Sequence, residues 1–192
     1  MNIALFSGGL ASFEATLRIL EDNYKNTEIW FFDTLIEDQD LYRFIKDSEN
    51  YFNKKICTFA DGRNPWEVFR DERFIGNSYK TPCNRVLKRK LLEIRIKEIS
   101  KHEELNLIFG ISTNEIKRVS KIIKGWQKKN IQVRFPLIED SSYKELSHED
   151  FETKYKIEVP RLYKLGFRHN NCGGACVKAG ITQWIHLYEK MP

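Results

Sequence analysis

The chain has 192 residues, of which 41% are hydrophobic and 31% charged, and its net charge is +5. This composition is typical of a globular protein with one domain over residues 1–192, and it excludes a disordered or fibrous chain. The apolar runs are too short for a membrane span, and the first residues do not resemble a signal peptide. Four unevenly spaced cysteines do not indicate a secreted disulfide scaffold. We therefore expect a reducing, cytoplasmic location and no membrane partner; the oligomeric state stays open.

Apolar strand-like segments alternate with helical segments along the chain. The expected strands are residues 3–6, 28–32, 55–59, 105–109 and 131–135. The expected helices are residues 12–20, 39–52, 84–99, 117–129, 148–155 and 173–188. The longest irregular segment, residues 61–82, is a candidate lid or substrate loop. This alternation predicts an α/β fold, a single doubly wound parallel sheet of about five strands with helices on both faces.

A turn of small residues, here called the glycine loop, joins the first strand to the first helix. It consists of Ser7, Gly8, Gly9, Leu10, Ala11 and Ser12. Such a turn leaves backbone N–H groups free at a helix N-terminus, where they bind anions. The glycines allow close approach of a phosphate, and the serines add hydroxyl donors. The alternative is an ordinary turn with Ser12 as the helix N-cap. The loop lacks the Gly-Lys-Ser/Thr ending of a Walker loop and is not a G-x-G-x-x-G dinucleotide turn.

Other polar residues follow the second and fourth expected strands. Ligands of doubly wound sheets bind at the carboxyl ends of strands, so these residues should meet the glycine loop at one edge. Asp33 is a candidate for ribose or base recognition, or else a turn residue. After Gly110, Glu115 is a candidate ligand of Mg²⁺ or of a ribose hydroxyl, and Arg118 a candidate phosphate ligand. The alternative for this segment is an ordinary helix start.

Three of the four cysteines are candidates for chemistry. Cys83 precedes an expected helix, whose N-terminus favours a thiolate, while Cys172 and Cys176 lie in a glycine-rich turn after His169. The three cysteines could hold an iron–sulfur cluster, and with the imidazole they could hold zinc. A cysteine pair could instead act as a sulfur-transfer nucleophile and its resolving partner, or the thiols could be structural. Cys57 lies within an apolar strand and is expected to be a packing residue.

Positive charge is concentrated in two segments. The stretch Lys117–Arg134 has seven Lys or Arg and no Asp or Glu, and Lys88, Arg89 and Lys90 form a second group. Together with Trp126 as a stacking residue, the stretch is a candidate contact surface for tRNA or DNA. The alternative is a solvated helix face.

The motifs resemble, in order and over nearly the whole chain, the phosphoadenosine phosphosulfate reductase-like branch of the adenine nucleotide alpha-hydrolase (PP-loop ATP pyrophosphatase) superfamily. The glycine loop resembles the family's S-G-G-x-[D/T/A]-S loop. The other matching segments are 81–88, with a cysteine before a basic helix, 110–118, 135–138, 160–166 and 169–176. Three positions depart from the pattern. Ala11 stands where many ATP pyrophosphatases have Asp, and Ser112 and Asn114 replace Arg and Asp.

The resemblance implies an adenine nucleotide, such as ATP, with its phosphates on the glycine loop. It implies cleavage of ATP between the α- and β-phosphates with Mg²⁺, adenylation of an acceptor, and transfer of sulfur from Cys172 or Cys176 to a nucleobase, with Cys83 as a further catalytic cysteine. Lys88 would stabilise the developing charge. One alternative is a phosphosulfate reductase-like enzyme, although such reductases resemble each other in a tail cysteine and no cysteine follows Cys176. Another is a non-catalytic nucleotide sensor or a nucleic-acid-binding subunit.

Overall fold

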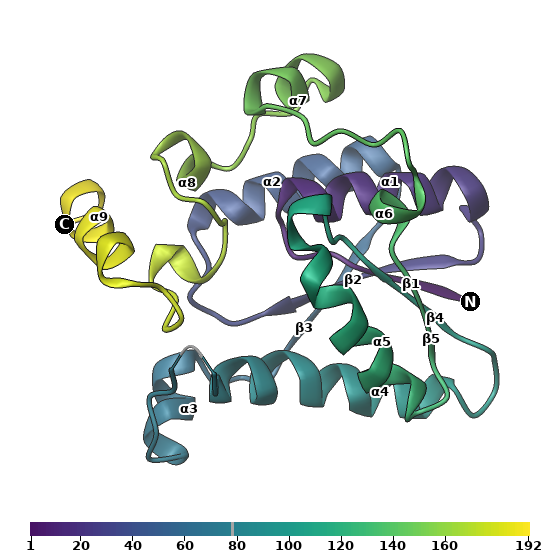
Figure 1. Cartoon of the computed structure of the whole chain (residues 1–192), viewed down its shortest axis with the longest axis horizontal. Helices are drawn as coiled ribbons and strands as arrows, with labels where there is room; N and C mark the ends of the chain where they lie inside the picture. The colour runs from purple at the N-terminus through teal and green to yellow at the C-terminus, as the bar shows by residue number, and fades with distance from the viewer. Residues whose placement is uncertain (78) are drawn as a thin grey trace.

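Five parallel strands form one sheet in the computed structural model, which describes residues 1–77 and 79–192 (Figure 1). The strand order is β3-β2-β1-β4-β5, so the order reverses between β1 and β4. This arrangement confirms the expected doubly wound α/β fold. The strands are β1 (Asn2–Leu5), β2 (Thr27–Asp33), β3 (Ile56–Ala60), β4 (Asn106–Phe109) and β5 (Gln132–Arg134).

Helices cover both faces of the sheet, because the central strands are apolar on both sides. Helices α1 (Leu10–Asn23) and α2 (Gln39–Phe52) lie on one face, and α4 (Leu91–Ile99) and α5 (Val119–Gln127) on the other (Figure 1). The remaining helical elements are α3 (Pro65–Asp71), the π-helix η1 (Asn84–Lys90), the 3₁₀-helix η2 (Thr113–Arg118), α6 (Pro136–Glu139), α7 (His148–Tyr155), α8 (Arg161–Lys164), the 3₁₀-helix η3 (Cys172–Gly174) and α9 (Ile181–Lys190). No helix among the described residues is both long and apolar enough to cross a bilayer.

Two apolar clusters fix the helices to the sheet. Under α1, α2 and α7 the cluster is aromatic, with the Phe13 ring centroid 4.7 Å from that of Phe52 and 5.1 Å from that of Phe151. On the other face, Trp30, Leu107 and Trp126 belong to a second cluster. Each large side chain buried in this way contributes about 1.5–3 kcal/mol to folding.

The structure differs from the sequence expectations in three segments. The expected irregular segment 61–82 contains α3, which begins with a capping box between Asn64 and Glu67. The expected helix 84–99 starts as a π-helix and becomes α-helical only at Leu91. The last helix begins at Ile181 rather than at Gly173, because Gly173 and its neighbour have positive φ angles that end a helix.

The close approach of β4 to α1 generates a stability prediction. A Cβ atom added at Gly110 would lie 2.5 Å from the Ser12 Cα atom and 2.8 Å from the Ala11 carbonyl oxygen. Backbone cannot yield as a side chain does, so Gly110→Ala should lower the free energy of unfolding by about 1–3 kcal/mol. Urea denaturation measures the change.

The matched control is Gly125→Ala in α5, where an added Cβ meets no atom within 4 Å. It should be neutral, or stabilise by up to about 1 kcal/mol. Equal unfolding midpoints for the Gly110 variant and the unmodified protein would contradict the proposed backbone contact.

Candidate nucleotide and cysteine site

The glycine loop leaves the N-terminus of α1 without a side-chain cap. The N-cap is Gly9, whereas Ser12 lies inside the first turn, so the alternative with Ser12 as N-cap is wrong. The Ser12 hydroxyl donates to the Gly9 carbonyl at 2.7 Å and accepts the Ser7 N–H at 3.1 Å. These bonds hold the loop closed around Gly8, whose φ of +77° favours glycine. The loop thus has the form of an anion site at a helix N-terminus.

The segment before the cysteine turn packs onto this loop. Asn170 is buried, and its Nδ2 donates to the Gly8 carbonyl at 3.0 Å. The backbone N–H groups of Leu10 and Asn170 lie beside the hydroxyl of Tyr163, while burial raises the pKa of that hydroxyl to about 12. The Asn170 Oδ1 atom has no partner, and it is the one such buried side-chain polar atom in residues 1–77 and 79–192. A buried acceptor without a donor costs about 1–3 kcal/mol, so it is suited to a donor from a ligand.

The other residues proposed to bind the nucleotide are engaged within the protein. Both carboxylate oxygens of Asp33 accept from the Tyr42 hydroxyl, and one also accepts the Leu35 N–H at 2.7 Å. Asp33 therefore stabilises the turn after β2, as in the simpler interpretation. Glu115 and Arg118 form an ion pair with each other on η2. With Ala11 in the loop and these carboxylates paired, the described residues do not offer a ready Mg²⁺ site there.

Glu37 is a site residue that the sequence reasoning missed. Its side chain is 1% exposed, accepts from the Thr34 hydroxyl at 2.8 Å and the Cys172 N–H at 2.5 Å, and lies 3.5 Å from the Lys88 Nζ atom. Glu37 thus joins the turn after β2, η1 and the cysteine turn at one point. In the sequence, Glu37 is simply an acidic residue just before the N-cap of α2, and acidic residues are common in ordinary turns.

The structure brings the three candidate cysteines to this same region. Hydrogen bonding with the neighbouring Cys172 thiol is the main cause that lowers the pKa of Cys176, and the Lys178 backbone N–H and the charges of Lys178 and Lys88 lower it further. The same hydrogen bond, burial and the Glu37 carboxylate raise the pKa of Cys172. The pKa of Cys83 is also raised, chiefly by burial and further by Cys176. The thiolate expected at Cys83 is therefore wrong, because desolvation outweighs the effect of the helix N-terminus.

The proposed metal ligands are not assembled. His169 lies near Glu115 and Arg118, and burial and the Arg168 charge lower its pKa. Across residues 1–77 and 79–192, no three His, Cys, Asp or Glu side chains are grouped closely enough to hold a metal ion. The residues present therefore do not fit the expected zinc or iron–sulfur set of Cys83, His169, Cys172 and Cys176. Cys57, expected to be a packing residue, is exposed on the edge strand β3.

The basic stretch Lys117–Arg134 forms η2, α5 and β5. Trp126 is only 9% exposed and belongs to the core, so the interpretation of Trp126 as a stacking residue is wrong. Lys129 pairs with Glu93 at 2.6 Å, and Arg134 pairs with Glu139 at 2.8 Å. The amphipathic pattern of the helix turned the tryptophan toward the sheet, leaving a charged face without an aromatic platform.

Comparisons with known proteins identify the fold. The sequence matches no protein-family model and no curated protein. The chain is similar to the phosphoadenylyl-sulfate (PAPS) reductase of Candida auris, solved as a phosphate complex, with 14% identity and a TM-score of 0.58 over 88% of this chain and 80% of the reductase. A structure described as a predicted subunit of tRNA methyltransferase from Methanocaldococcus jannaschii gives 19% identity and a TM-score of 0.47 over 81% of this chain and 76% of that one. The first likeness confirms the PAPS reductase-like fold that the motifs implied, and at this identity it concerns the fold alone.

The unequal thiols generate a reactivity prediction. Because the pKa of Cys176 is lowered, its alkylation by iodoacetamide should reach a plateau at a lower pH than that of an ordinary thiol, since the thiolate is the reactive form. Cys57 is more exposed, but burial, Glu28 and Glu49 raise its pKa, so it should label more slowly. Peptide mass spectrometry over a pH series measures each rate.

The test of the cause is Cys172→Ala, which removes the thiol that donates to Cys176. The labelling midpoint of Cys176 should move to higher pH, with Cys57 unchanged as the internal control. An unmoved midpoint would assign the low pKa to the lysines alone.

Proposed function

We propose that the protein is an enzyme that binds an adenine nucleotide on the glycine loop and acts on it with the Cys172–Cys176 dithiol. The observation that carries the proposal is that one short segment serves both parts. Asn170 bonds to the Gly8 carbonyl, and Cys172 follows two residues later. The N–H groups of the first turn of α1 that follow Leu10 would take the phosphates, since the helix dipole favours negative charge there. The unpartnered Oδ1 of Asn170 would accept a donor of the ligand.

The reaction we favour is reduction of an adenylyl sulfate. The Cys176 thiolate attacks the sulfate sulfur, the bond from that sulfur to the phosphate oxygen breaks, and the adenosine monophosphate leaves with that oxygen. Cys176 then carries an S-sulfonate. Cys172, once deprotonated, attacks the Cys176 sulfur, sulfite leaves, and a disulfide remains. The two thiols supply the two electrons that reduce the sulfate sulfur, and an external dithiol would restore them.

The neighbouring charges suit these roles. A nucleophile is more effective as a thiolate, and Cys176 is the cysteine whose pKa is lowered. Cys172 is held as a thiol beside Glu37 until the second step needs it. Lys88 lies 3.5 Å from Glu37, and its charge stabilises a thiolate at either cysteine. Its ammonium group is therefore suited to shift toward the sulfonate charge during the reaction.

A second candidate is ATP-dependent adenylation of an acceptor, after which a persulfide on Cys176, formed with sulfane sulfur from an external persulfide donor, delivers its outer sulfur and AMP leaves. The positive charge of residues 65–90, next to Cys83, favours it, because it suits a polyanionic acceptor such as RNA. Release of pyrophosphate from ATP would distinguish this reaction from sulfite release. Binding of nucleotide with neither product would indicate a non-catalytic sensor.

Nucleotide binding is tested at Gly9. An added Cβ there would lie 3.1 Å from the Tyr163 hydroxyl oxygen and 3.6 Å from Ser7 Oγ, at the mouth of the loop. Gly9→Val should weaken binding of adenylyl sulfate, ATP or AMP by more than tenfold, about 1.4 kcal/mol. Calorimetric titration measures the affinity. Gly180→Val is the matched control, since a Cβ there meets no atom within 4 Å. Unchanged affinity in a folded Gly9→Val protein would remove the loop from the site.

The dithiol reaction is tested in a single turnover with adenylyl sulfate. The reduced protein should yield sulfite and the Cys172–Cys176 disulfide in equal amounts. Cys172→Ser should stop at an S-sulfonate on Cys176, which intact-mass measurement detects, and Cys176→Ser should give neither product. Cys57→Ser is the control, because Cys57 lies on the edge strand β3 and takes no part. Sulfite release that survives Cys176→Ser would contradict the assignment.

A further inference from the structure

Helix α3 is amphipathic, but only one of its apolar sides is covered. Val68 is fully buried and packs with Val86 and Leu87 of η1. On the other side, Trp66 is 49% exposed and Ile75, just beyond the helix, is 67% exposed. Exposed apolar side chains that gather in one place, unlike scattered ones, are typical of a binding site.

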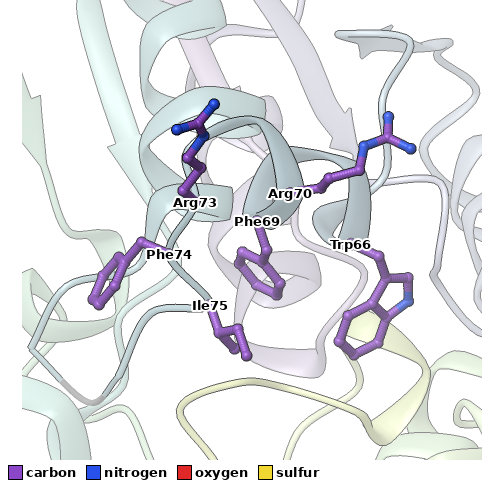
Figure 2. A pocket seen from close by; sticks show the side chains of 6 residues that line it. All are labelled: Trp66, Phe69, Arg70, Arg73, Phe74 and Ile75. Atoms are coloured by element: carbon purple, nitrogen blue, oxygen red, sulfur yellow. The ribbon is translucent and has the colours of Figure 1, made fainter.

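These side chains form a cavity of about 340 Å³ (Figure 2). Phe69 is buried and makes the floor, and its ring centroid lies 5.8 Å from that of Trp66 in an edge-to-face arrangement. The volume lies within the range of small-ligand sites. The lining residues are Trp66, Phe69, Arg70, Arg73, Phe74 and Ile75.

The surroundings carry an excess of positive charge. From Pro65 to Lys90 there are seven Lys or Arg and three Asp or Glu. Two of the three acids already have cationic partners, since Asp71 lies 3.0 Å from Arg63 and Glu72 pairs with Arg85. The third is the capping-box acid of α3. The free charge at this surface is therefore cationic.

Two arginines border the cavity itself. Arg70 is 77% exposed, and its contact with Asp71 is long, at 3.8 Å. Arg73 has no ion pair within the described part of the chain. Figure 2 shows Trp66, Phe69 and Ile75 pointing to one side of α3, with the two guanidinium groups pointing away from the rings at its border. An aromatic face beside separate cationic groups matches a ligand whose flat apolar part and anionic part are likewise separate.

We propose that this cavity binds single-stranded nucleic acid, with one unpaired base against Trp66 and the adjoining phosphates at Arg70 and Arg73. A duplex keeps its bases stacked within the helix and cannot offer one to the tryptophan, so single strands are preferred. A protein partner would fit the apolar lining, but it would not need the cationic excess. The charged face of α5 cannot supply the stacking contact, because Trp126 is in the core.

The site is independent of the proposed dithiol reaction, since it requires neither the glycine loop nor a cysteine. Cys83 packs against the cluster that contains Val68 of α3, and Cys176 is close enough to raise the pKa of Cys83. A strand held on α3 would thus lie near the dithiol, while its binding can be measured without nucleotide.

The experiment is a fluorescence-anisotropy titration of the full chain with labelled homopolymer RNA and DNA oligonucleotides, each as a single strand and as a duplex of equal length. Single strands should bind more tightly than duplexes. Trp66→Ala should weaken single-strand binding by about tenfold, and Trp66→Phe should restore most of it, because a stacked base contributes through the ring. The double variant Arg70→Ala/Arg73→Ala should reduce the slope of log affinity against log salt concentration by about two, one for each lost phosphate contact.

Matched controls are Tyr188→Ala, an exposed aromatic on α9, and Lys46→Ala, an exposed cation on α2. Neither should change the affinity. Tighter binding of RNA than of DNA would identify RNA as the ligand, and equal binding would mean that the ribose hydroxyl is not read. Equal affinities for Trp66→Ala and the unmodified protein, equal binding of duplex and single strand, or no binding at low salt would each overturn the proposal.

Discussion

The hydrogen bond from Asn170 to the Gly8 carbonyl is the contact on which the site depends. It joins the turn after β1 to a segment 162 residues away. Two further links hold that segment in place. The Cys172 N–H donates to Glu37, and Arg161 forms a bidentate ion pair with the buried Asp38 at 2.7–3.0 Å. Charge-assisted bonds of this kind are stronger than neutral ones, and Asp38 is only 2% exposed, which limits screening by water.

This arrangement explains how thiols with opposite pKa shifts are adjacent. The backbone of the cysteine turn approaches the turn after β2 so closely that a Cβ at Gly173 would lie 2.9 Å from the Ile36 carbonyl oxygen. That approach places Cys172 against Glu37, whose charge opposes ionisation of its thiol, while Lys178 favours the thiolate of Cys176 and Lys88 acts on both cysteines. The hydrogen bond between the two thiols is the main cause of the opposite pKa shifts, and the Glu37 carboxylate, brought close by this backbone contact, adds to the shift at Cys172.

The fold could be predicted from the sequence because it depends on local patterns. Apolar strands, the periodicity of the helices and the glycine loop each use neighbouring residues, and parallel strands then bring their carboxyl ends together. What could not be predicted depends on contacts between distant segments. A tryptophan among basic residues, such as Trp126, can be either a stacking residue or a core residue. Only the packing of α5 against the sheet separates the two cases. Glu37 was missed for the same reason, since its partners Lys88 and Cys172 come from two other parts of the chain.

The long separation between Gly8 and Asn170 also bears on how the protein is made. The glycine loop leaves the ribosome well before its partner, which follows only after on the order of ten seconds of synthesis at typical rates. During that interval the glycine loop lacks the segment around Asn170 that packs onto it, and Cys172 and Cys176 have not yet been synthesised. A nascent chain can thus form much of its hydrophobic core while holding no reactive cysteine pair, which separates folding of the scaffold in time from assembly of its chemistry.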